Sequence, residues 1–223
     1  MSRPSAAILI SGSGTNLQAF IDETASGKLD LDLSVVLSNR PEAAGLQRAR
    51  KAKISTECLR HRGFPQREQF DAALVETLDK YHPDLIILAG FMRILTSTFV
   101  NQFSGRILNI HPSLLPKFPG LDTHQRAIDA GEEWHGSTVH FVTEDLDGGP
   151  AIIQGRVPVM PDDSAAGLAA RVLELEHRIY PEAARMFAAG RLECRDGSAW
   201  LDGERLEEPL QYRGQSPARP SAA

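Results

Sequence analysis

The sequence predicts an α/β protein with a doubly wound, mostly parallel sheet and antiparallel additions toward its C-terminus. In the first half, short apolar runs alternate with longer amphipathic segments, which is the order of successive βαβ units. One run, DLIILAG (84–90), is apolar throughout, as in a central parallel strand that is covered on both faces. In the second half, two strand-like runs follow each other with only a turn between them, which favours antiparallel pairing.

The elements of the first half follow from the spacing of their apolar residues. The segment 65–81 reads as a helix, because Phe70, Leu74, Leu78 and Tyr81 recur at helical spacing. The full expected order is strand 6–10, helix 16–25, strand 31–38, helix 42–52, helix 65–81, strand 84–90, helix 95–103 and strand 106–111.

The second half contains strands, one long helix and a hairpin. The helix is indicated by an apolar stripe of Leu168, Val172, Leu175 and Ile179. The hairpin turns at the pair Asp196–Gly197, which is a common turn dipeptide. The full expected order is strand 137–143, strand 151–159, helix 164–189 and hairpin 191–203.

The organisation expected from these elements is two halves that share one sheet. The N-terminal α/β half covers 1–103 and the C-terminal half covers 104–206. The remaining residues, 207–223, end in GQSPARPSAA, which has the composition of a disordered tail.

Composition and charge exclude several classes of protein. The 223 residues carry a formal net charge of −5, which opposes a broad basic surface for nucleic acid. The two cysteines, Cys58 and Cys194, indicate no disulfide framework, so a reducing compartment fits best. The apolar runs are too short for a signal peptide or a membrane span. We expect a cytoplasmic monomer or homodimer that binds small molecules and neither nucleic acid nor membranes.

The stretch ISGSGTN (10–16) joins the first expected strand to the first helix. Gly12 and Gly14 allow a tight turn, and the free amides at a helix N-terminus attract an anion. Leu17 replaces the third glycine of a dinucleotide fingerprint, no P-loop lysine follows, and no acidic residue ends the second strand. The pattern favours a simple phosphate cradle. The alternative is a turn that uses glycine for its shape alone.

Asn109 and His111 lie at the end of a strand that Pro112 terminates. Residues two apart on a strand share a face, so both side chains point the same way. Both can donate hydrogen bonds to an oxygen that becomes negative during a reaction. Their place is also that of ligands in open α/β sheets, beyond the carboxyl ends of the strands. The alternative is a structural histidine that is simply hydrogen-bonded.

Asp147 lies in the turn TEDLDGGP, where aspartate is common for local reasons. Its functional interpretation requires a carboxylate near His111 that orients the imidazole and favours its protonated form. His135 and His140 are five residues apart, which on an alternating strand places them on opposite faces. Neither this pair nor the other histidines form a metal-ligand pattern, so no metal is expected.

Five segments together resemble one known family. They are ISGSGTN, AGFMRIL, NIHPSLLPKFPG, HGSTVHFVTEDLDGGP and LEHRIYP, in the order typical of phosphoribosylglycinamide formyltransferases of purine biosynthesis. The match runs from about residue 6 to 206. NIHPSLLP alone resembles the wider group of folate-dependent formyltransferases. Its combination with the Gly-rich first turn and the LDGG loop is specific to the phosphoribosylglycinamide family.

The resemblance implies a Rossmann-like formyltransferase fold and transfer of the formyl group of 10-formyltetrahydrofolate to the amine of 5'-phosphoribosylglycinamide. It implies phosphate binding in the N-terminal half, and catalysis and folate binding in the C-terminal half. The folate is then a co-substrate, and no cofactor is tightly bound.

The resemblance also assigns roles to individual residues. The catalytic positions are Asn109, His111 and Asp147, and the positions for the phosphoribosyl substrate are Gly14, Thr15, Asn16 and Glu176. The folate positions are Arg67, Met92, Arg93, Ile94, Leu95, Asn109, Thr143, Glu144, Asp145, Leu146 and Asp147. Two residues depart from the family pattern. Thr15 stands where serine is frequent and keeps the hydroxyl, whereas Asp122 stands where histidine is often found and receives no role.

Other functions fit the sequence less well. A formyltransferase acting on initiator tRNA is expected to carry an additional basic C-terminal domain, and a formyltetrahydrofolate hydrolase an extra regulatory domain before the first strand. A nicotinamide-dependent oxidoreductase lacks support, because the third glycine and the acidic residue are missing. A catalytically silent binding module leaves Asn109, His111 and Asp147 without a purpose.

Overall fold

The computed structural model describes residues 3–214 and 217–218, and the chain forms two compact units. The first unit comprises Met1–Asn109 with Val142–Glu144, and the second comprises Ile110–Phe141 with Asp145–Ala223. Among the described residues, no helix is long and apolar enough to cross a membrane.

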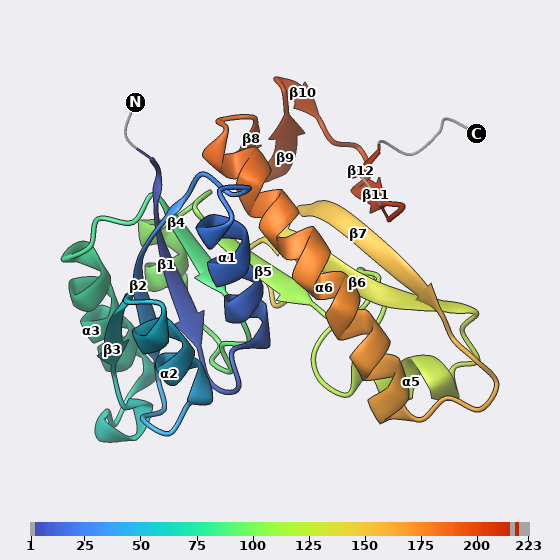
Figure 1. Ribbon diagram of the computed structural model, residues 1–223, viewed down its shortest axis with the longest axis horizontal. Helices are drawn as coiled ribbons and strands as arrows, with labels where there is room; N and C mark the ends of the chain where they lie inside the picture. The colour runs from blue at the N-terminus through green and yellow to red at the C-terminus, as the bar shows by residue number, and fades with distance from the viewer. Residues whose placement is uncertain (1–2, 215–216, 219–223) are drawn as a thin grey trace. The chain divides into compact units, whose positions relative to one another are not determined.

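The first unit is built on five parallel strands (Figure 1). At its centre, β1 (Ser5–Ile10) pairs with β2 (Asp32–Ser38) on one side and with β4 (Leu85–Leu88) on the other. Beyond β2 lies β3 (Ser55–Cys58), and beyond β4 lies β5 (Ile107–His111), whose last two residues belong to the second unit. Because all five run in the same direction, their carboxyl ends meet at one edge of the sheet.

Helices cover both faces of this sheet, which confirms the predicted doubly wound arrangement (Figure 1). On one face lie α1 (Thr15–Ala25) and α2 (Ala44–Lys51), and on the other α3 (Arg67–Asp79) and α4 (Ser97–Gln102). The predicted stripe of α3 is buried at Phe70, Leu74 and Leu78, where it packs on apolar residues of β1, β2, β4 and β5. A short 3-10 turn, η1 (His61–Gly63), follows β3.

The second unit confirms the predicted antiparallel additions. In it, β6 (Trp134–Phe141) and β7 (Ala151–Pro158) form an antiparallel pair, and α6 (Ala165–Ala188) packs on both strands. A Cβ atom at Gly155 of β7 would lie 2.5 Å from Leu175 Cδ1. Glycine at this position therefore lets the apolar stripe of α6 approach the strand closely.

Several short elements were not predicted. The strand β3 and α5 (Thr123–Asp129), which packs on α6, lack an apolar run of their own. The predicted hairpin exists as β8 (Leu192–Arg195) and β9 (Ser198–Leu201), and β10 (Glu204–Arg205) extends it.

The structure corrects the prediction of a disordered tail over 207–223. Leu210–Tyr212 form β11, which runs parallel to β7, and Pro217–Ala218 form β12 beside it. The reason is burial, because Leu210 is an apolar residue that the unit encloses almost completely. Residues 215–216 and 219–223 of the expected tail lie outside the described residues.

Candidate active site

The end of β5 carries the two polar residues that the sequence singled out. Asn109 is half-buried and His111 is buried, and the alternation of the strand gives them a common face. The intervening Ile110 is buried, and Pro112 follows the strand directly. The strand therefore brings an amide and an imidazole to the edge where its hydrogen-bonding ends.

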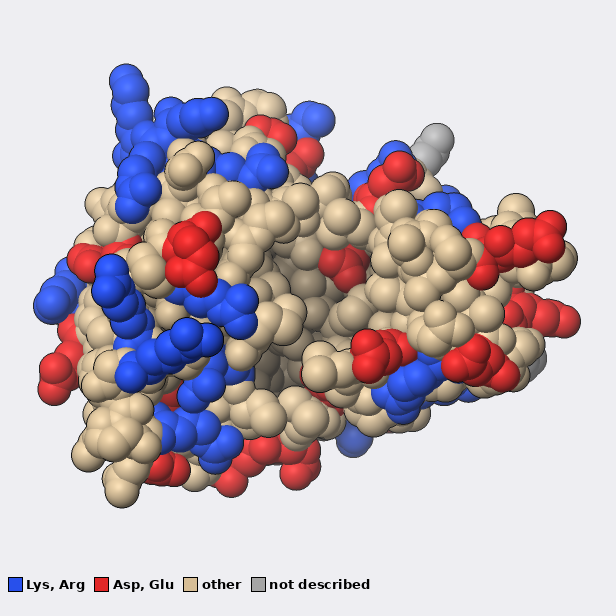
Figure 2. Space-filling view, turned by 90° about the horizontal axis from the view of Figure 1, so that it is seen from below, with Lys and Arg blue, Asp and Glu red and all other residues tan. Residues whose placement is uncertain are grey.

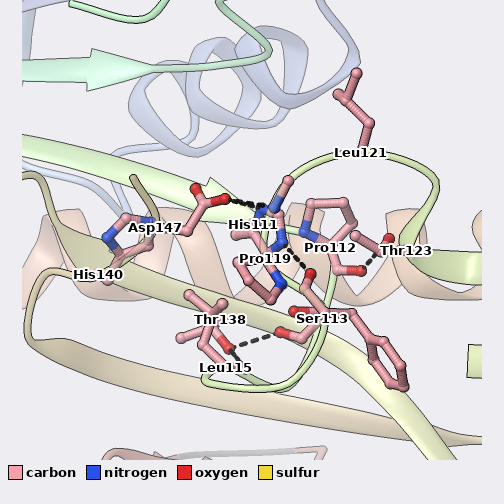
Figure 3. Close-up of polar contacts among 12 residues, drawn as sticks. His111, Pro112, Ser113, Leu115, Pro119, Leu121, Thr123, Thr138, His140 and Asp147 are labelled. Carbon is pink, nitrogen blue, oxygen red and sulfur yellow. Dashed lines mark hydrogen bonds and ion pairs between the residues drawn. The ribbon is translucent and has the colours of Figure 1, made fainter. Parts of the chain in front are cut away.

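His111 and Asp147 lie together, as the functional interpretation of Asp147 requires. The Asp147 Oδ2 atom is 3.4 Å from His111 Nδ1, and Figure 3 shows the carboxylate directed at the ring. The other ring nitrogen, Nε2, is 2.9 Å from the carbonyl oxygen of Phe118. Both partners are acceptors, so the ring satisfies both only when each of its nitrogens carries a proton.

The backbone around Asp147 fixes the position of its carboxylate. The Gly120 N–H donates to Asp147 Oδ2 at 2.9 Å, and the Asp147 side chain is almost completely buried. Asp147 itself adopts a left-handed conformation with φ of 52°, which aspartate tolerates better than most residues. Loop 112–120 and the turn at Asp147 thus hold the carboxylate from two directions.

Buried polar groups of β6 and β7 fasten loop 112–120. The Thr138 hydroxyl lies 2.7 Å from the Ser113 carbonyl oxygen and accepts the Leu115 N–H at 3.0 Å (Figure 3). The Gln154 amide donates to the Leu115 carbonyl at 2.7 Å. Within the loop, the Ser113 hydroxyl donates to the Lys117 carbonyl at 2.6 Å. These bonds fix the loop whose carbonyl at Phe118 faces His111.

Glu176 reaches the backbone of β5 through a serine. The buried Ser137 Oγ lies 2.8 Å from the carbonyl oxygen of His111 and 3.2 Å from Glu176 Oε1. Glu176 comes from α6, where it is the buried charged residue of the apolar face. The structure therefore places this predicted substrate contact close to the strand that carries His111.

Two further histidines, one on α5 and one on β6, form a hydrogen-bonded pair to which the sequence assigned no role. His124 Nδ1 of α5 is 3.1 Å from His135 Nε2 of β6. Burial, reinforced by His124, lowers the pKa of His135 to about 4, although its bond to the Pro112 carbonyl acts in the opposite direction. Burial also lowers the pKa of His124, and His111 adds to this effect. The pair is therefore held in the neutral form that can share one hydrogen bond.

His140 also has a lowered pKa, because burial outweighs its bond to the Phe141 carbonyl and the nearby Asp147 carboxylate. The register of β6 with β7 shifts between Val139 and His140, where Ile152 of β7 is the extra residue, so β6 itself continues without an insertion. In the part of the chain that the structure describes, no three metal-ligating side chains gather at one point.

The predicted phosphate cradle lies at the carboxyl end of β1 in the first unit. Gly14 precedes α1 with φ of 70°, and a Cβ atom there would lie 2.7 Å from the Cα of Gly45. Arg48 of α2 donates to the Ser13 carbonyl at 2.8 Å and so fastens the turn from outside. Thr15 and Asn16 form the first turn of α1, the end of the helix at which free amides lie.

The residues predicted to bind folate are divided between the two units. Arg67 begins α3, and Met92, Arg93, Ile94 and Leu95 form an irregular segment after β4 in the first unit. Thr143 and Glu144 belong to the first unit as well, whereas Asp145, Leu146 and Asp147 belong to the second. Asp122, which received no role, precedes α5 with φ of 56°.

Several partners of the candidate catalytic residues could not be identified from sequence. The Phe118 carbonyl and the Gly120 N–H are backbone groups, so no residue type announces them. Ser137 carried no distinguishing signal, because β6 also contains the polar residues His135, Thr138 and His140.

Comparison with known proteins identifies related chains. Residues 5–184 match the family described as formyl transferase. Phosphoribosylglycinamide formyltransferase of Escherichia coli (strain K12) is 52% identical over 199 residues, which cover 89% of this chain and 94% of that protein. The human trifunctional purine biosynthetic protein adenosine-3 is 44% identical over 200 residues, which cover 89% of this chain and 20% of that protein.

Solved structures show the same fold. The phosphoribosylglycinamide formyltransferase of Coxiella burnetii, in complex with CHES, gives a TM-score of 0.87 at 50% identity and covers 92% of this chain and 96% of that chain. A formyltetrahydrofolate deformylase from Pseudomonas putida KT2440 gives a TM-score of 0.80 at 26% identity, with 89% of this chain and 70% of that chain covered.

Proposed function

The chain belongs to the formyl transferase family, and on this premise we propose that it transfers the formyl group of 10-formyltetrahydrofolate to the amine of 5'-phosphoribosylglycinamide. The products are formylglycinamide ribonucleotide and tetrahydrofolate, within purine biosynthesis. The observation that carries this proposal is the 52% identity, over most of both chains, to an enzyme named for that reaction. The folate acts as a co-substrate that leaves after each turnover.

The geometry at the end of β5 supplies the groups that such a transfer needs. The substrate amine attacks the formyl carbon, whose carbonyl oxygen becomes a tetrahedral oxyanion. The Asn109 amide and protonated His111 donate hydrogen bonds to this oxyanion. When the intermediate collapses, the bond from the formyl carbon to the folate nitrogen breaks, and a proton passes from the attacking amine to that nitrogen. Asp147 stabilises the positive charge on His111 and orients the ring.

The carboxyl edge of the first unit provides the phosphate site and part of the folate site in this proposal. Gly14, Thr15 and Asn16 hold the phosphate through helix amides. Glu176, which belongs to the second unit, is assigned to the phosphoribosyl substrate. Segment 92–95 supplies apolar walls and backbone polar groups for the folate. In Figure 1 the β1 arrow points down, so the view from below in Figure 2 faces the carboxyl edge of the first unit. Figure 2 shows Lys and Arg side chains gathered on this unit. Such a surface suits two substrates that both carry negative charge.

The proposal includes a cytoplasmic location and small-molecule partners only. Cys58 and Cys194 are both unpaired thiols, which supports a reducing compartment. Burial raises the pKa of the Cys194 thiol, so this residue is less reactive than an exposed cysteine.

A turnover assay with both substrates tests the proposed function. The purified protein is incubated with 10-formyltetrahydrofolate, with and without phosphoribosylglycinamide, and tetrahydrofolate, formate and formylated product are each measured. We expect tetrahydrofolate and formylated product in equal amounts, and only when both substrates are present. Release of formate without the acceptor would instead indicate a hydrolase, the activity named for the Pseudomonas putida structure.

A further inference from the structure

Segment 92–95 is irregular and exposes two of its four side chains, yet its two ends are held by buried side chains. The side chains of Met92 and Ile94 are large, apolar and more than half exposed, at 62% and 58%. No regular secondary structure spans the segment between β4 and α4. Its backbone position therefore depends on whatever fixes the residues at its start and its end.

Ser11 fixes the start of the segment. This residue directly follows β1 and is buried, and its hydroxyl accepts the Met92 N–H at 2.8 Å. The same hydroxyl donates to Asn39 Oδ1 at 2.6 Å, while the Ser11 N–H donates to the Gly90 carbonyl at 3.1 Å. Ser11 thus contacts the chain on both sides of Phe91 and orients the peptide group of Met92.

Asn39 extends this arrangement across the sheet edge. It follows β2 and is buried, and its amide nitrogen lies 3.2 Å from His61 Nδ1 of η1. The same His61 nitrogen lies 3.0 Å from the Asn39 carbonyl oxygen. Met92, Ser11, Asn39 and His61 follow β4, β1, β2 and β3, which are adjacent in that order. The polar contacts therefore link four neighbouring carboxyl ends.

Asp71 fixes the end of the segment. The residue is 2% exposed, and its carboxylate accepts the Thr96 N–H through Oδ2 at 2.6 Å. Thr96 is the N-cap of α4, and the Thr96 side chain accepts the Phe99 N–H at 3.4 Å. The other carboxylate oxygen of Asp71 is buried without a hydrogen-bond partner among the described residues. A buried carboxylate that makes one strong backbone bond is costly, which argues for a positional role.

We propose that Ser11 and Asp71 are positioning residues for the folate co-substrate, because they hold the two ends of segment 92–95 in the geometry that binds it. Neither residue contacts the folate in this proposal. The inference rests on the proposed function, since it takes segment 92–95 as the folate wall. It adds that segment 92–95 is positioned by residues outside the segment. Ser11 lies in the turn that also contains the phosphate cradle, and Asp71 lies in α3.

Single substitutions separate positioning from general stability. Ser11→Ala and Asp71→Leu each remove one anchor, whereas Ser11→Thr and Asp71→Asn keep an oxygen acceptor. Ser38→Ala is the matched control, because Ser38 is a buried serine in β2 whose hydroxyl accepts the Arg40 N–H at 3.1 Å. In the described part of the chain the Ser38 hydroxyl bonds to Arg40 and not to segment 92–95, so its loss tests serine removal alone.

The first readout is the KM for each substrate. Ser11→Ala and Asp71→Leu should raise the KM for 10-formyltetrahydrofolate about three- to tenfold, the factor that one hydrogen bond represents. The KM for phosphoribosylglycinamide should change by less than about twofold. The conservative variants should restore the folate KM, and Ser38→Ala should leave it unchanged. Equal rises in both KM values, or the same rise in Ser38→Ala, would overturn the proposal.

The second readout is amide hydrogen exchange of the free protein, which requires no turnover. Exchange over residues 91–96 should become faster in Ser11→Ala and Asp71→Leu while exchange in the strands of the sheet stays as in the wild type. An unchanged rate over 91–96 means that the two residues do not anchor the segment. Faster exchange with an unchanged folate KM means that the anchored geometry is irrelevant to folate. If the wild-type protein fails to turn over, the proposed function fails, and this exchange measurement still decides the anchoring.

Discussion

At the scale of single residues, His111 faces a hydrogen-bond acceptor at each ring nitrogen. The Asp147 carboxylate lies at Nδ1 and the Phe118 carbonyl at Nε2. A neighbouring carboxylate stabilises a positively charged imidazole, and a carbonyl oxygen accepts its second proton. In our mechanism, Asp147 therefore acts through His111 rather than on the substrate directly.

Asp147→Asn should damage the chemical step more than substrate binding. The change is nearly isosteric, and the amide oxygen can still accept the Gly120 N–H, but the negative charge beside His111 is lost. We expect kcat to fall by about 10²-fold or more, with the Kd of both substrates little changed. Steady-state kinetics and equilibrium binding measure the two effects. Asp129→Asn, which removes the same charge from an exposed site on α5, is the control.

A double variant tests whether Asp147 and His111 act as one unit. Once His111→Ala has removed the imidazole, Asp147→Asn should lower kcat by less than about threefold further. The measurement is kcat of the two single variants and of the double variant. Fully multiplicative losses would mean that Asp147 works independently of His111, and the proposed partnership would be wrong.

Gly14→Ala should impair the phosphate cradle. The residue has φ of 70°, and the added Cβ would lie 2.7 Å from the Cα of Gly45, so strain and a backbone clash both displace the turn. We expect the KM for phosphoribosylglycinamide to rise about tenfold or more, with the folate KM changed by less than about twofold. Gly27→Ala is the control for strain alone, because Gly27 has φ of 74° and nothing within 4 Å of the added atom.

The candidate catalytic residues were only partly accessible from the sequence. Strand alternation and the following proline placed Asn109 and His111 on one face at the end of β5. Nothing local distinguished Asp147 from an ordinary turn aspartate, so its role came from the family resemblance. Its distance to His111 depends on the contact between loop 112–120 and the turn that contains Asp147. This contact joins segments that are distant in the sequence, so no local pattern predicts it.

At the scale of elements, helices and strands with a long periodic pattern of apolar residues were predicted from the sequence, and those without one were missed. The helices α3 and α6 carry three or more buried residues at helical spacing, and both were predicted within a few residues of their ends. By contrast, β3 and α5 expose many of their residues, so neither carries a periodic apolar signal. The strand β11 has three residues and exists because β7 supplies its hydrogen-bond partners.

The contact between half-buried His124 and buried His135 joins α5 to β6 and should make the fold sensitive to acid. The folded-state pKa of His135 is about 4, below its ordinary value of 6.5, because burial and His124 oppose its charge. Between these values the unfolded chain binds a proton that the folded chain does not. The contribution of neutral His135 to the free energy of unfolding is therefore fully present above about pH 6.5 and is lost as the pH falls to about 4. The loss from His135 is at most about 3 kcal/mol.

Urea unfolding at several pH values measures this effect. We expect the free energy of unfolding of the wild-type protein to decrease between about pH 6.5 and 4, and His135→Gln to reduce that decrease because glutamine does not titrate. Burial lowers the pKa of His124 and His140 as well, so a smaller decrease of the same sign should remain. Identical pH dependence in the variant would show that the charge of His135 does not affect folding.

At the scale of the whole molecule, charge is distributed unevenly along the chain. Residues 39–67 contain eight of the 24 Lys and Arg residues and two of the 29 Asp and Glu residues, although the net charge is −5. Arg40 follows β2, and Arg60 and Arg62 flank His61, which contacts Asn39. All three side chains are exposed at the carboxyl edge of the first unit. A net charge of −5 does not reveal this local excess of positive charge, and Figure 2 shows Lys and Arg side chains gathered on the first unit.

This local charge should attract the anionic substrates and make their capture depend on salt. Raising the ionic strength from about 0.01 M to 0.15 M shortens the Debye length from about 30 Å to about 8 Å. We therefore expect the KM for phosphoribosylglycinamide to rise several-fold over this range in the wild-type protein, while kcat changes little. The triple variant Arg40→Gln/Arg60→Gln/Arg62→Gln should have a higher KM at low salt and should lose most of the salt dependence.

A second triple variant separates this local field from net charge. Arg50→Gln/Lys51→Gln/Lys53→Gln removes the same three charges, but these residues lie at the end of α2 and before β3, toward the opposite edge of the sheet. If steering depends on the arginines at the carboxyl edge, this variant keeps a salt dependence like that of the wild-type protein. Equal losses in the two triple variants would mean that the overall charge of the molecule governs capture. In that case the position of Arg40, Arg60 and Arg62 beside the ends of β2 and β3 would have no part in it.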